Sequence, residues 1–426
     1  LEDVVLWMQK ALFLGVTVTF VEHVYCCGCA RPWLKSVRRA CGAGAPMTTE
    51  LKLPLYFDNN ATTRPCEVAL VAHSEALTED WRNPSAPSSS AARVRVKLDL
   101  AREKLAACLG VSLDTVSFTS GATESNNAVF SHISRHASPH SRVLLSPVEH
   151  PSVREAARRY FPGRVDELAV GGSEIVDPSI LAPALDATEV ALVSVMAANN
   201  ESGVIQPIKE AAECAHAAGA LFHCDAVQAV GRIPIDMKRL GVDMLTISAH
   251  KLGGPKGVGA LILAEGMEVE ALIRGGGQER RHRGGTENVP GIAGFGVAVR
   301  EVQEKRLTIG RVANLIGILE RRAVAAVPDA VIFGEDAPRI ANTSLLALPG
   351  VDAETQIMAL DLAGIEVSAG AACSSGKVGE SHVLQAMGVA DELGRCAIRI
   401  SVGTENTVEE VDKFIEVWSG LRKRAG

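Results

Sequence analysis

Aromatic residues, long apolar runs and stretches of a single charge sign are all scarce in this sequence, and each absence excludes a class of function. Tryptophan, tyrosine and phenylalanine make up 4% of the 426 residues, which argues against base-stacking platforms for single-stranded nucleic acid. The formal net charge is −7, and no long run of like charges indicates a nucleic-acid or membrane surface. We therefore expect neither a nucleic acid nor a membrane as a partner.

The N-terminal residues 1–46 differ from the rest of the chain. Their apolar stretch Ala11–Val21 is shorter than the roughly 20 residues that span a bilayer, and it precedes basic residues, the reverse of a secretory signal. The cysteine cluster at 26–29 lacks the paired spacing of a zinc module, so a metal site there is the less favoured alternative. We interpret 1–46 as an extension outside the catalytic fold, with Met47 as the candidate start.

Cysteine usage and composition indicate a globular protein of a reducing compartment. Six of the ten cysteines are scattered over the chain beyond the extension, which does not resemble a disulfide framework. Hydrophobic residues make up 47% and charged residues 22%, which is ordinary for a globular chain of two or three domains. We expect a cytoplasmic protein, although the extension leaves an organelle open.

Short apolar strands alternate with helical patterns through the first two thirds of the chain. Val68–Trp81 and Arg93–Leu109 have helical spacing, whereas Val116–Thr119 and Met244–Ser248 read as buried strands. This alternation indicates a mainly parallel α/β sheet, in which ligands bind at the carboxyl ends of the strands. After about Arg300 strands and helices follow in mixed order, which fits a smaller α+β domain.

The change of pattern gives a domain prediction. We predict a large domain over residues 66–300 and a small C-terminal domain over 301–426. The segment 47–65 is expected to pack with the small domain.

A lysine directly follows one of the predicted strands. It stands in the turn Ser248-Ala249-His250-Lys251, which is followed by glycines. A lysine held in such a turn can have a lowered pKa, and a neutral amine is what a Schiff base requires. Taken alone, an ordinary surface lysine in a glycine-rich loop would be the better interpretation.

An acidic residue ends the preceding strand. Asp225 can pair with a protonated pyridine nitrogen and strengthen an electron sink. Gln228, three residues later, can reach the hydroxyl of such a ring. Taken alone, Asp225 would more simply be a helix cap.

Two further strand ends carry polar motifs. The turn Ser120–Asn127 offers backbone N–H groups and the Thr123 hydroxyl to a phosphate at a helix N-terminus, although it is not a Walker loop. His150 could stack on a flat ring and exchange protons. The simpler alternatives are a capped helix and a histidine of no consequence at the start of a helix.

Four other positions are candidates for ligand contact or reactivity. Asn200 follows a buried strand, and the loop 275–288 could bring a hydroxyl to a phosphate. Cys373 stands between small residues where a thiol can react, and Arg399 lies in an apolar strand where it needs a carboxylate partner. The alternatives for the first three are, in turn, an Asn-rich turn, a surface loop and a small hydrophobic residue, and for Arg399 a substrate carboxylate is one option.

The motifs occur together in one known family. Asp58–Thr63, Thr119–Asn127, Ser248–Lys251 and Gly370–Gly376 resemble the cysteine desulfurases of the NifS/IscS group, in the class-V aminotransferase branch of the fold-type I pyridoxal-phosphate enzymes. The resemblance runs from about Leu53 to the C-terminus. It implies an α/β fold with a large, mainly parallel-sheet domain and a smaller α+β domain.

The resemblance also implies a role for each candidate residue. Lys251 would bind pyridoxal 5′-phosphate as a Schiff base, and Asn200 and Arg399 would hold the substrate carboxylate. Thr286 would act from the neighbouring subunit, which implies a homodimer. The implied cofactor-binding residues are Ala122, Thr123, His150, Asn200, Asp225, Gln228, Ser248, His250, Lys251 and Thr286.

The implied reaction converts L-cysteine to L-alanine. Lys251 or His150 would take the Cα proton, and the Cys373 thiolate would attack the substrate sulfur and carry it as a persulfide. The sulfur would pass to an acceptor such as an iron–sulfur scaffold protein. Cys373 would also be the one metal contact, lending its sulfur to a nascent [2Fe–2S] cluster.

Three alternatives remain at this point. Selenocysteine lyase shares the scaffold, and the segments Ala371–Cys373 and Gly277–Arg280 are also similar to it. In a plain class-V aminotransferase Cys373 would be incidental. A non-catalytic sulfur-assembly partner would not need Lys251 as a cofactor ligand.

Overall fold

The computed structural model describes residues 54–304, 308–370 and 380–425. The extension predicted over residues 1–46 lies outside these ranges. Within them, no helix combines the length and apolar character needed to cross a membrane.

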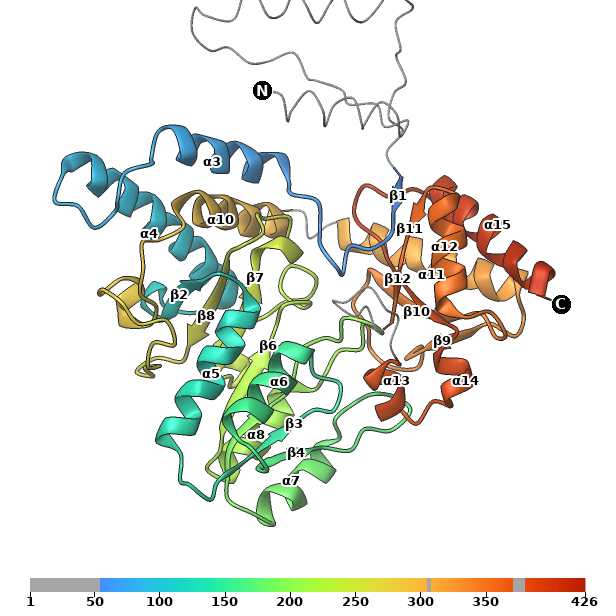
Figure 1. The fold of residues 1–426 in the computed structure, drawn as a ribbon, viewed down its shortest axis with the longest axis horizontal. Coiled ribbons are helices and arrows are strands. Elements are labelled where there is room, and N and C mark those ends of the chain that lie inside the picture. Colours follow the sequence, from blue (N-terminus) through green and yellow to red (C-terminus); the bar gives the residue numbers. More distant parts are fainter. Residues whose placement is uncertain (1–53, 305–307, 371–379, 426) are drawn as a thin grey trace, which may run out of the picture. The chain divides into compact units, whose positions relative to one another are not determined.

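A seven-stranded sheet forms the larger part of the structure, in the order β2-β8-β7-β6-β5-β3-β4 (Figure 1). Its β3, β4, β5, β6 and β7 pair in parallel, and β8 runs antiparallel between β2 and β7. The predicted mainly parallel α/β sheet is therefore confirmed. The strands are β2 Val116–Thr119, β3 Arg142–Leu145, β4 Val165–Glu167, β5 Val190–Ser194, β6 Leu221–Asp225, β7 Met244–Ser248 and β8 Gly259–Leu263.

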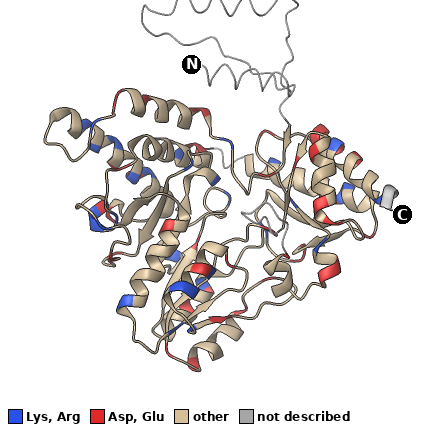
Figure 2. Ribbon diagram, viewed as in Figure 1, with Lys and Arg blue, Asp and Glu red and all other residues tan. Residues whose placement is uncertain are grey.

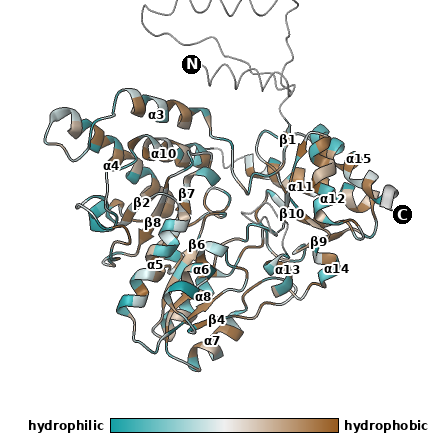
Figure 3. Ribbon diagram, in the orientation of Figure 1, coloured by the Kyte–Doolittle hydropathy of each residue, from teal (hydrophilic) through white to brown (hydrophobic). Residues whose placement is uncertain are grey.

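Helices cover both faces of this sheet. Successive residues of a strand point to opposite faces, so apolar residues of one strand can pack against helices on both sides. In β3, Leu144 packs into one core with α4, α7, α8 and α10, whereas Val143 and Leu145 pack into another with α5 and α6. Figure 3 shows hydrophobic ribbon along β2, β7 and β8. The helices are α3 Glu67–Thr78, α4 Ser89–Leu109, α5 Ala122–His136, α6 Pro151–Tyr160, α7 Pro178–Asp186, α8 Ile208–Ala217, α9 Met237–Leu240 and α10 Val289–Glu304, with short 3-10 turns η1 Leu113–Thr115, η2 Ala249–Lys251 and η3 Glu279–Arg281.

The C-terminal part contains a second sheet with its own core. This antiparallel sheet has the order β12-β13-β10-β9, and Phe414 and Trp418 are buried beside it. The Trp418 indole N–H donates to Gln356 Oε1 at 2.8 Å. The elements are α11 Ile309–Ala326, β9 Val331–Phe333, β10 Thr343–Ala347, α12 Ala353–Leu362, β11 Ile365–Glu366, β12 Ser368–Ala369, α13 His382–Ala386, α14 Asp391–Gly394, β13 Ala397–Ser401 and α15 Val408–Ala425.

The segment that precedes α3 joins the C-terminal core. Its strand β1, Leu55–Tyr56, pairs in parallel with β11, and Phe57 is fully buried against Phe414. The domain boundaries drawn from the sequence stay predictions. Charged positions of both signs are interspersed along the described ribbon (Figure 2).

Candidate active site

Lys251 lies at the carboxyl end of β7, in the turn η2. Its Nζ donates to the backbone carbonyl of Asn60 and, at 2.9 Å, to that of Ala61. Burial, followed by the nearby Arg399 and Arg232 guanidinium groups, lowers the pKa of this lysine to about 7. A substantial fraction of the amine is therefore neutral near physiological pH.

The segment Asp58–Thr63 connects this lysine to β13. The Thr63 N–H donates to the carbonyl of His250 at 2.9 Å, and the Asn59 N–H donates to that of Ser401 at 3.1 Å. The Thr62 hydroxyl also contacts the His250 ring at 3.2 Å. The turn η2 and the strand β13 are far apart in the sequence, and both therefore contact the polar segment Asp58–Thr63.

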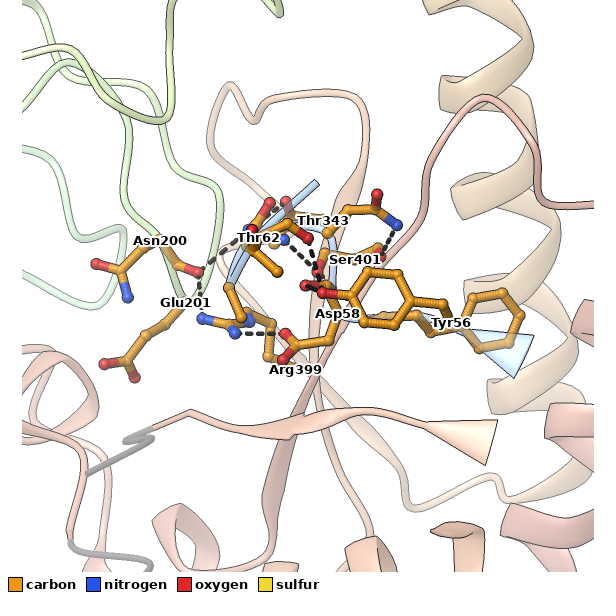
Figure 4. Close-up of polar contacts among 12 residues, drawn as sticks. Tyr56, Asp58, Thr62, Asn200, Glu201, Thr343, Arg399 and Ser401 are labelled. Atoms are coloured by element: carbon orange, nitrogen blue, oxygen red, sulfur yellow. Dashed lines mark hydrogen bonds and ion pairs between the residues drawn. The ribbon is translucent and has the colours of Figure 1, made fainter. Parts of the chain in front are cut away.

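Arg399 lies in the middle of β13 and is buried (Figure 4). Its Nη2 pairs with Asp58 Oδ1 at 2.6 Å, and its Nη1 donates to the carbonyl of Asn200 at 3.0 Å. Its Nε has no hydrogen-bond partner among the described residues. Asn200 and Arg399, both predicted to hold a carboxylate, therefore lie together, and Asp58 already gives the guanidinium a carboxylate partner.

Asp225 is buried at the carboxyl end of β6. One carboxylate oxygen accepts from Asn126 Nδ2 at 3.0 Å and the other from the Val227 N–H at 3.0 Å. The second contact caps the turn that follows β6, whereas the simpler interpretation of the sequence was a helix cap and no helix begins at this point. The first ties the carboxylate to α5, whose N-terminus was predicted to bind a phosphate.

One glycine, Gly259, allows the segments that were predicted to bind the phosphate to approach one another. In the sheet, Gly259 lies opposite Thr119 on one side and Ser248 on the other. A Cβ at Gly259 would lie 2.7 Å from the Cα of Gly121, so only glycine permits this approach. The approach brings the start of α5, with residues 122–123, to the end of the sheet where β7 also ends.

His150 caps the N-terminus of α6 through its ring. Nδ1 accepts from the Ser152 N–H at 3.1 Å and lies 2.8 Å from the Ser152 hydroxyl, so the neutral imidazole carries its proton on Nε2. The residue is exposed, but desolvation by surrounding protein atoms lowers its pKa, as does the nearby Lys251, while Asp225 raises it. His150 is therefore both a helix cap and a neighbour of the two groups predicted to bind the cofactor.

The remaining predicted residues are placed differently. Gln228 is buried, and its Nε2 donates to the Asn60 carbonyl at 3.1 Å. Thr286 is exposed in the loop between η3 and α10. Cys373 lies outside the described residues. Within the part of the chain that the structure does describe, no group of His, Cys, Asp and Glu side chains could hold a metal ion.

Comparison with known proteins decides the family. The family model described as Aminotransferase class-V matches residues 55–414. The chain belongs to the class-V aminotransferase family. A cysteine desulfurase of Cereibacter sphaeroides is 42% identical over 373 residues, which are 85% of this chain and 94% of the relative.

Solved structures of this family agree with that assignment. A NifS-like protein superposes with a TM-score of 0.81 at 34% identity, over 87% of this chain and 100% of that one. A structure named SspA in complex with cysteine has a TM-score of 0.70 at 26% identity, over 83% and 100%. These similarities place the chain among the cysteine desulfurases of the class-V family and confirm the predicted fold-type I architecture.

The structure adds site residues that sequence reasoning missed. Asp58 and Asn60 belong to the motif Asp58–Thr63 but were given no role from the sequence, and Arg232 belongs to none of the predicted motifs. Glu201 is buried and accepts from the Ser381 hydroxyl at 2.6 Å. Its only signal was its place after Asn200.

Proposed function

We propose that this chain is a cysteine desulfurase that converts L-cysteine to L-alanine and carries the released sulfur as a persulfide on Cys373. The observation that carries the proposal is the Lys251 amine, whose pKa is lowered to about 7. This amine and the buried Arg399 contact the same polar segment, Asp58–Thr63. The named activity of the relatives and the cysteine bound in one neighbouring structure support L-cysteine as the substrate.

The residues predicted to bind the cofactor fit pyridoxal 5′-phosphate by their chemistry. Asp225 offers a carboxylate to a protonated ring nitrogen, Lys251 offers an amine to the aldehyde, and the start of α5 offers N–H groups to the phosphate. Ala122, Thr123, Ser248 and His250 would surround the phosphate. When bound, this cofactor supplies an electron sink for negative charge that develops at the substrate Cα.

Arg399 and Lys251 would carry out the first part of the reaction. Arg399 would bind the substrate carboxylate together with Asn200, by exchanging or sharing its contact with Asp58. Lys251, once displaced by the substrate amine, would take the Cα proton. His150 is the poorer base because Nδ1 already accepts from the Ser152 N–H and Nε2 carries the proton.

Cys373 would carry out the second part. Its thiolate attacks the substrate sulfur, an S–S bond forms, and the Cβ–S bond breaks with its electron pair remaining on carbon. Protonation of that carbon gives the methyl group of alanine. The persulfide sulfur then passes to an acceptor protein, such as an iron–sulfur scaffold, where Cys373 would contact a nascent cluster as cargo.

We also propose that the enzyme works as a homodimer in which Thr286 completes the partner's phosphate site. Thr286 is exposed on its own subunit. Helix α3 exposes Leu70 (55%) and Leu77 (56%), and Trp81 just beyond it is 69% exposed. Apolar side chains exposed together on one helix are typical of a surface covered by another protein.

The test is to incubate the purified protein with L-cysteine and a thiol reductant, which releases the persulfide sulfur as sulfide, and to measure alanine and sulfide, with and without added cofactor. Lys251→Ala should abolish the visible absorbance band of the bound cofactor. Cys373→Ala should keep that band and lose sulfide release. Cys214→Ala, at a half-buried cysteine in α8, is the matched control and should behave as wild type.

Three outcomes would contradict the proposal. A strong preference for L-selenocysteine would make the enzyme a selenocysteine lyase. Full activity in Cys373→Ala would make the cysteine incidental, as in a plain aminotransferase. Absence of the absorbance band from the wild-type protein supplied with cofactor would exclude a pyridoxal-phosphate enzyme altogether.

A further inference from the structure

Arg232 contacts the predicted cofactor residue Gln228 from a tight turn after β6. The Arg232 N–H donates to the carbonyl of Ala229 at 2.9 Å. Gly231 has a φ of 82°, and a Cβ there would collide with the side chain of Val302, so the turn depends on glycine. The guanidinium folds back, and its Nη1 donates to Gln228 Oε1 and, at 3.2 Å, to the Gln228 carbonyl.

These contacts determine which way the Gln228 amide points. A guanidinium only donates hydrogen bonds, so the amide atom facing Arg232 must be the oxygen. On the other side of the amide, the nitrogen donates to the Asn60 carbonyl at 3.1 Å. A flipped amide would place donor against donor at Arg232 and acceptor against acceptor at Asn60, so both contacts select one orientation.

The oriented amide nitrogen lies beside the Lys251 amine. The Asn60 carbonyl that accepts from Gln228 also accepts from Lys251 Nζ, so both nitrogens meet at one oxygen. In pyridoxal phosphate, the ring oxygen is attached next to the carbon that bears the aldehyde. A donor beside the Lys251 nitrogen would therefore face that oxygen once the lysine had joined the aldehyde.

The geometry points to Arg232 as a positioning residue for the cofactor, which acts by holding the Gln228 amide with its nitrogen toward the cofactor's ring oxygen. This inference rests on the proposed function. Arg232 donates to Gln228 Oε1, and with the cofactor bound Gln228 Nε2 would donate to the ring oxygen, so the two hydrogen bonds would run in the same direction and strengthen each other. The positive charge of Arg232 would also stabilise negative charge on that oxygen.

A double-mutant cycle on cofactor binding tests the inference. Arg232→Met keeps the length of the side chain but removes its donors, and Gln228→Ala removes the amide. Each should weaken cofactor affinity about tenfold, the effect of losing one hydrogen bond to a charged group. Because Arg232 acts through Gln228, the double variant should bind about as weakly as either single variant, and not a hundredfold more weakly than wild type.

The absorbance spectrum provides a second readout that a merely structural role would not move. Arg232→Met and Gln228→Ala should shift the pH at which the visible band of the lysine-bound cofactor changes, in the same direction and by the same amount. Arg232→Lys keeps the charge and N–H donors, although not the planar guanidinium, and should restore part of the cofactor affinity. Arg239→Met, at a side chain that is 87% exposed, is the matched control and should leave both readouts unchanged.

The outcomes separate this inference from the proposed function. If the wild-type protein forms no absorbance band, the proposed function fails. If wild type binds the cofactor but the effects of Arg232→Met and Gln228→Ala on affinity multiply, Arg232 acts independently of Gln228 and the inference is wrong. An Arg232→Met spectrum that titrates as wild type would also overturn it.

Discussion

Burial favours the neutral form of ionisable side chains around the site. It is the largest cause of the lowered pKa of Lys251 and His150, and it raises the pKa of Glu201. The two shifts in opposite directions have one physical origin, since a charge loses hydration when protein surrounds it. Such a site therefore holds an amine and a carboxyl group, each with a pKa of about 7, that can exchange protons near neutral pH.

The raised pKa of Glu201 makes the free energy of unfolding depend on pH. Its pKa is raised from 4.5 to about 7, by burial against the opposing effects of Ser381 and Arg399. Between these two pH values the folded protein keeps a proton that the unfolded chain releases, so the Glu201 contribution to stability is full below about 4.5 and is lost as pH rises to about 7. The loss is on the order of 3 kcal/mol at most.

We expect Glu201→Gln to gain stability relative to wild type as the pH rises from 5 to 8. Glutamine still accepts the Ser381 hydrogen bond but does not ionise. The measurement is the difference in Tm between variant and wild type at pH 5 and at pH 8, with saturating cofactor. The exposed Glu210→Gln controls for loss of a surface carboxylate, and an equal Glu201→Gln difference at both pH values would contradict the expectation.

Among the elements, the loop 275–288 depends on one buried ion pair. Arg102 of α4 and Glu279 have side chains 6% and 3% exposed, and their charged atoms lie 2.8 Å apart. The same carboxylate oxygen of Glu279 accepts from the Phe118 N–H of β2 at 2.7 Å. Residues 279–281 all have positive φ, so these contacts hold a backbone conformation that non-glycine residues rarely adopt.

We expect Glu279→Ala to destabilise the protein by about 3–5 kcal/mol, because it leaves the Arg102 charge buried without its partner. Asp114→Ala removes the carboxylate from the neighbouring pair with Arg280, in which the aspartate side chain is 76% exposed. That change should cost only about 0–1 kcal/mol. Chemical unfolding of both variants measures the two losses in the free energy of unfolding. Equal losses would show that the buried Arg102–Glu279 pair stabilises the protein no more than the exposed pair does.

Element boundaries show where sequence patterns gave incomplete information. The predicted helix Arg93–Leu109 begins earlier, at Ser89, because the Ser88 hydroxyl accepts from the Ala91 N–H at 3.2 Å and polar residues carry the first turn. The predicted helix Val68–Trp81 ends at Thr78. Apolar periodicity marks the buried face of a helix, whereas its ends depend on capping contacts.

Across the whole molecule, strand-end residues could be predicted from the sequence and long-range partners could not. Lys251 follows one apolar strand and Asp225 ends another, and the carboxyl ends of parallel strands meet at one edge of a sheet. The Asp58–Arg399 pair joins residues 341 positions apart, and the Glu201–Ser381 bond joins residues 180 apart. No local pattern encodes such partners, because they depend on how the two cores pack.

The proposed dimer gives the last prediction, which concerns assembly. Wild-type protein should sediment at about twice the chain mass of 44.9 kDa, and Leu70→Glu combined with Leu77→Glu should shift it toward the monomer. If Thr286 acts on the partner's site, mixing subunits that carry Lys251→Ala with subunits that carry Thr286→Val should create hybrids with one complete site.

Such mixtures, unfolded and refolded together, should recover up to about a quarter of wild-type activity, since half of the dimers are hybrids and each has one intact site. The matched control mixes Lys251→Ala with Asp225→Asn subunits. Lys251 and Asp225 both belong to the site of their own chain, so every hybrid site carries one of the two changes and no activity should return. Recovery in the control, or none in the Thr286 mixture, would show that the subunits do not share sites in this way.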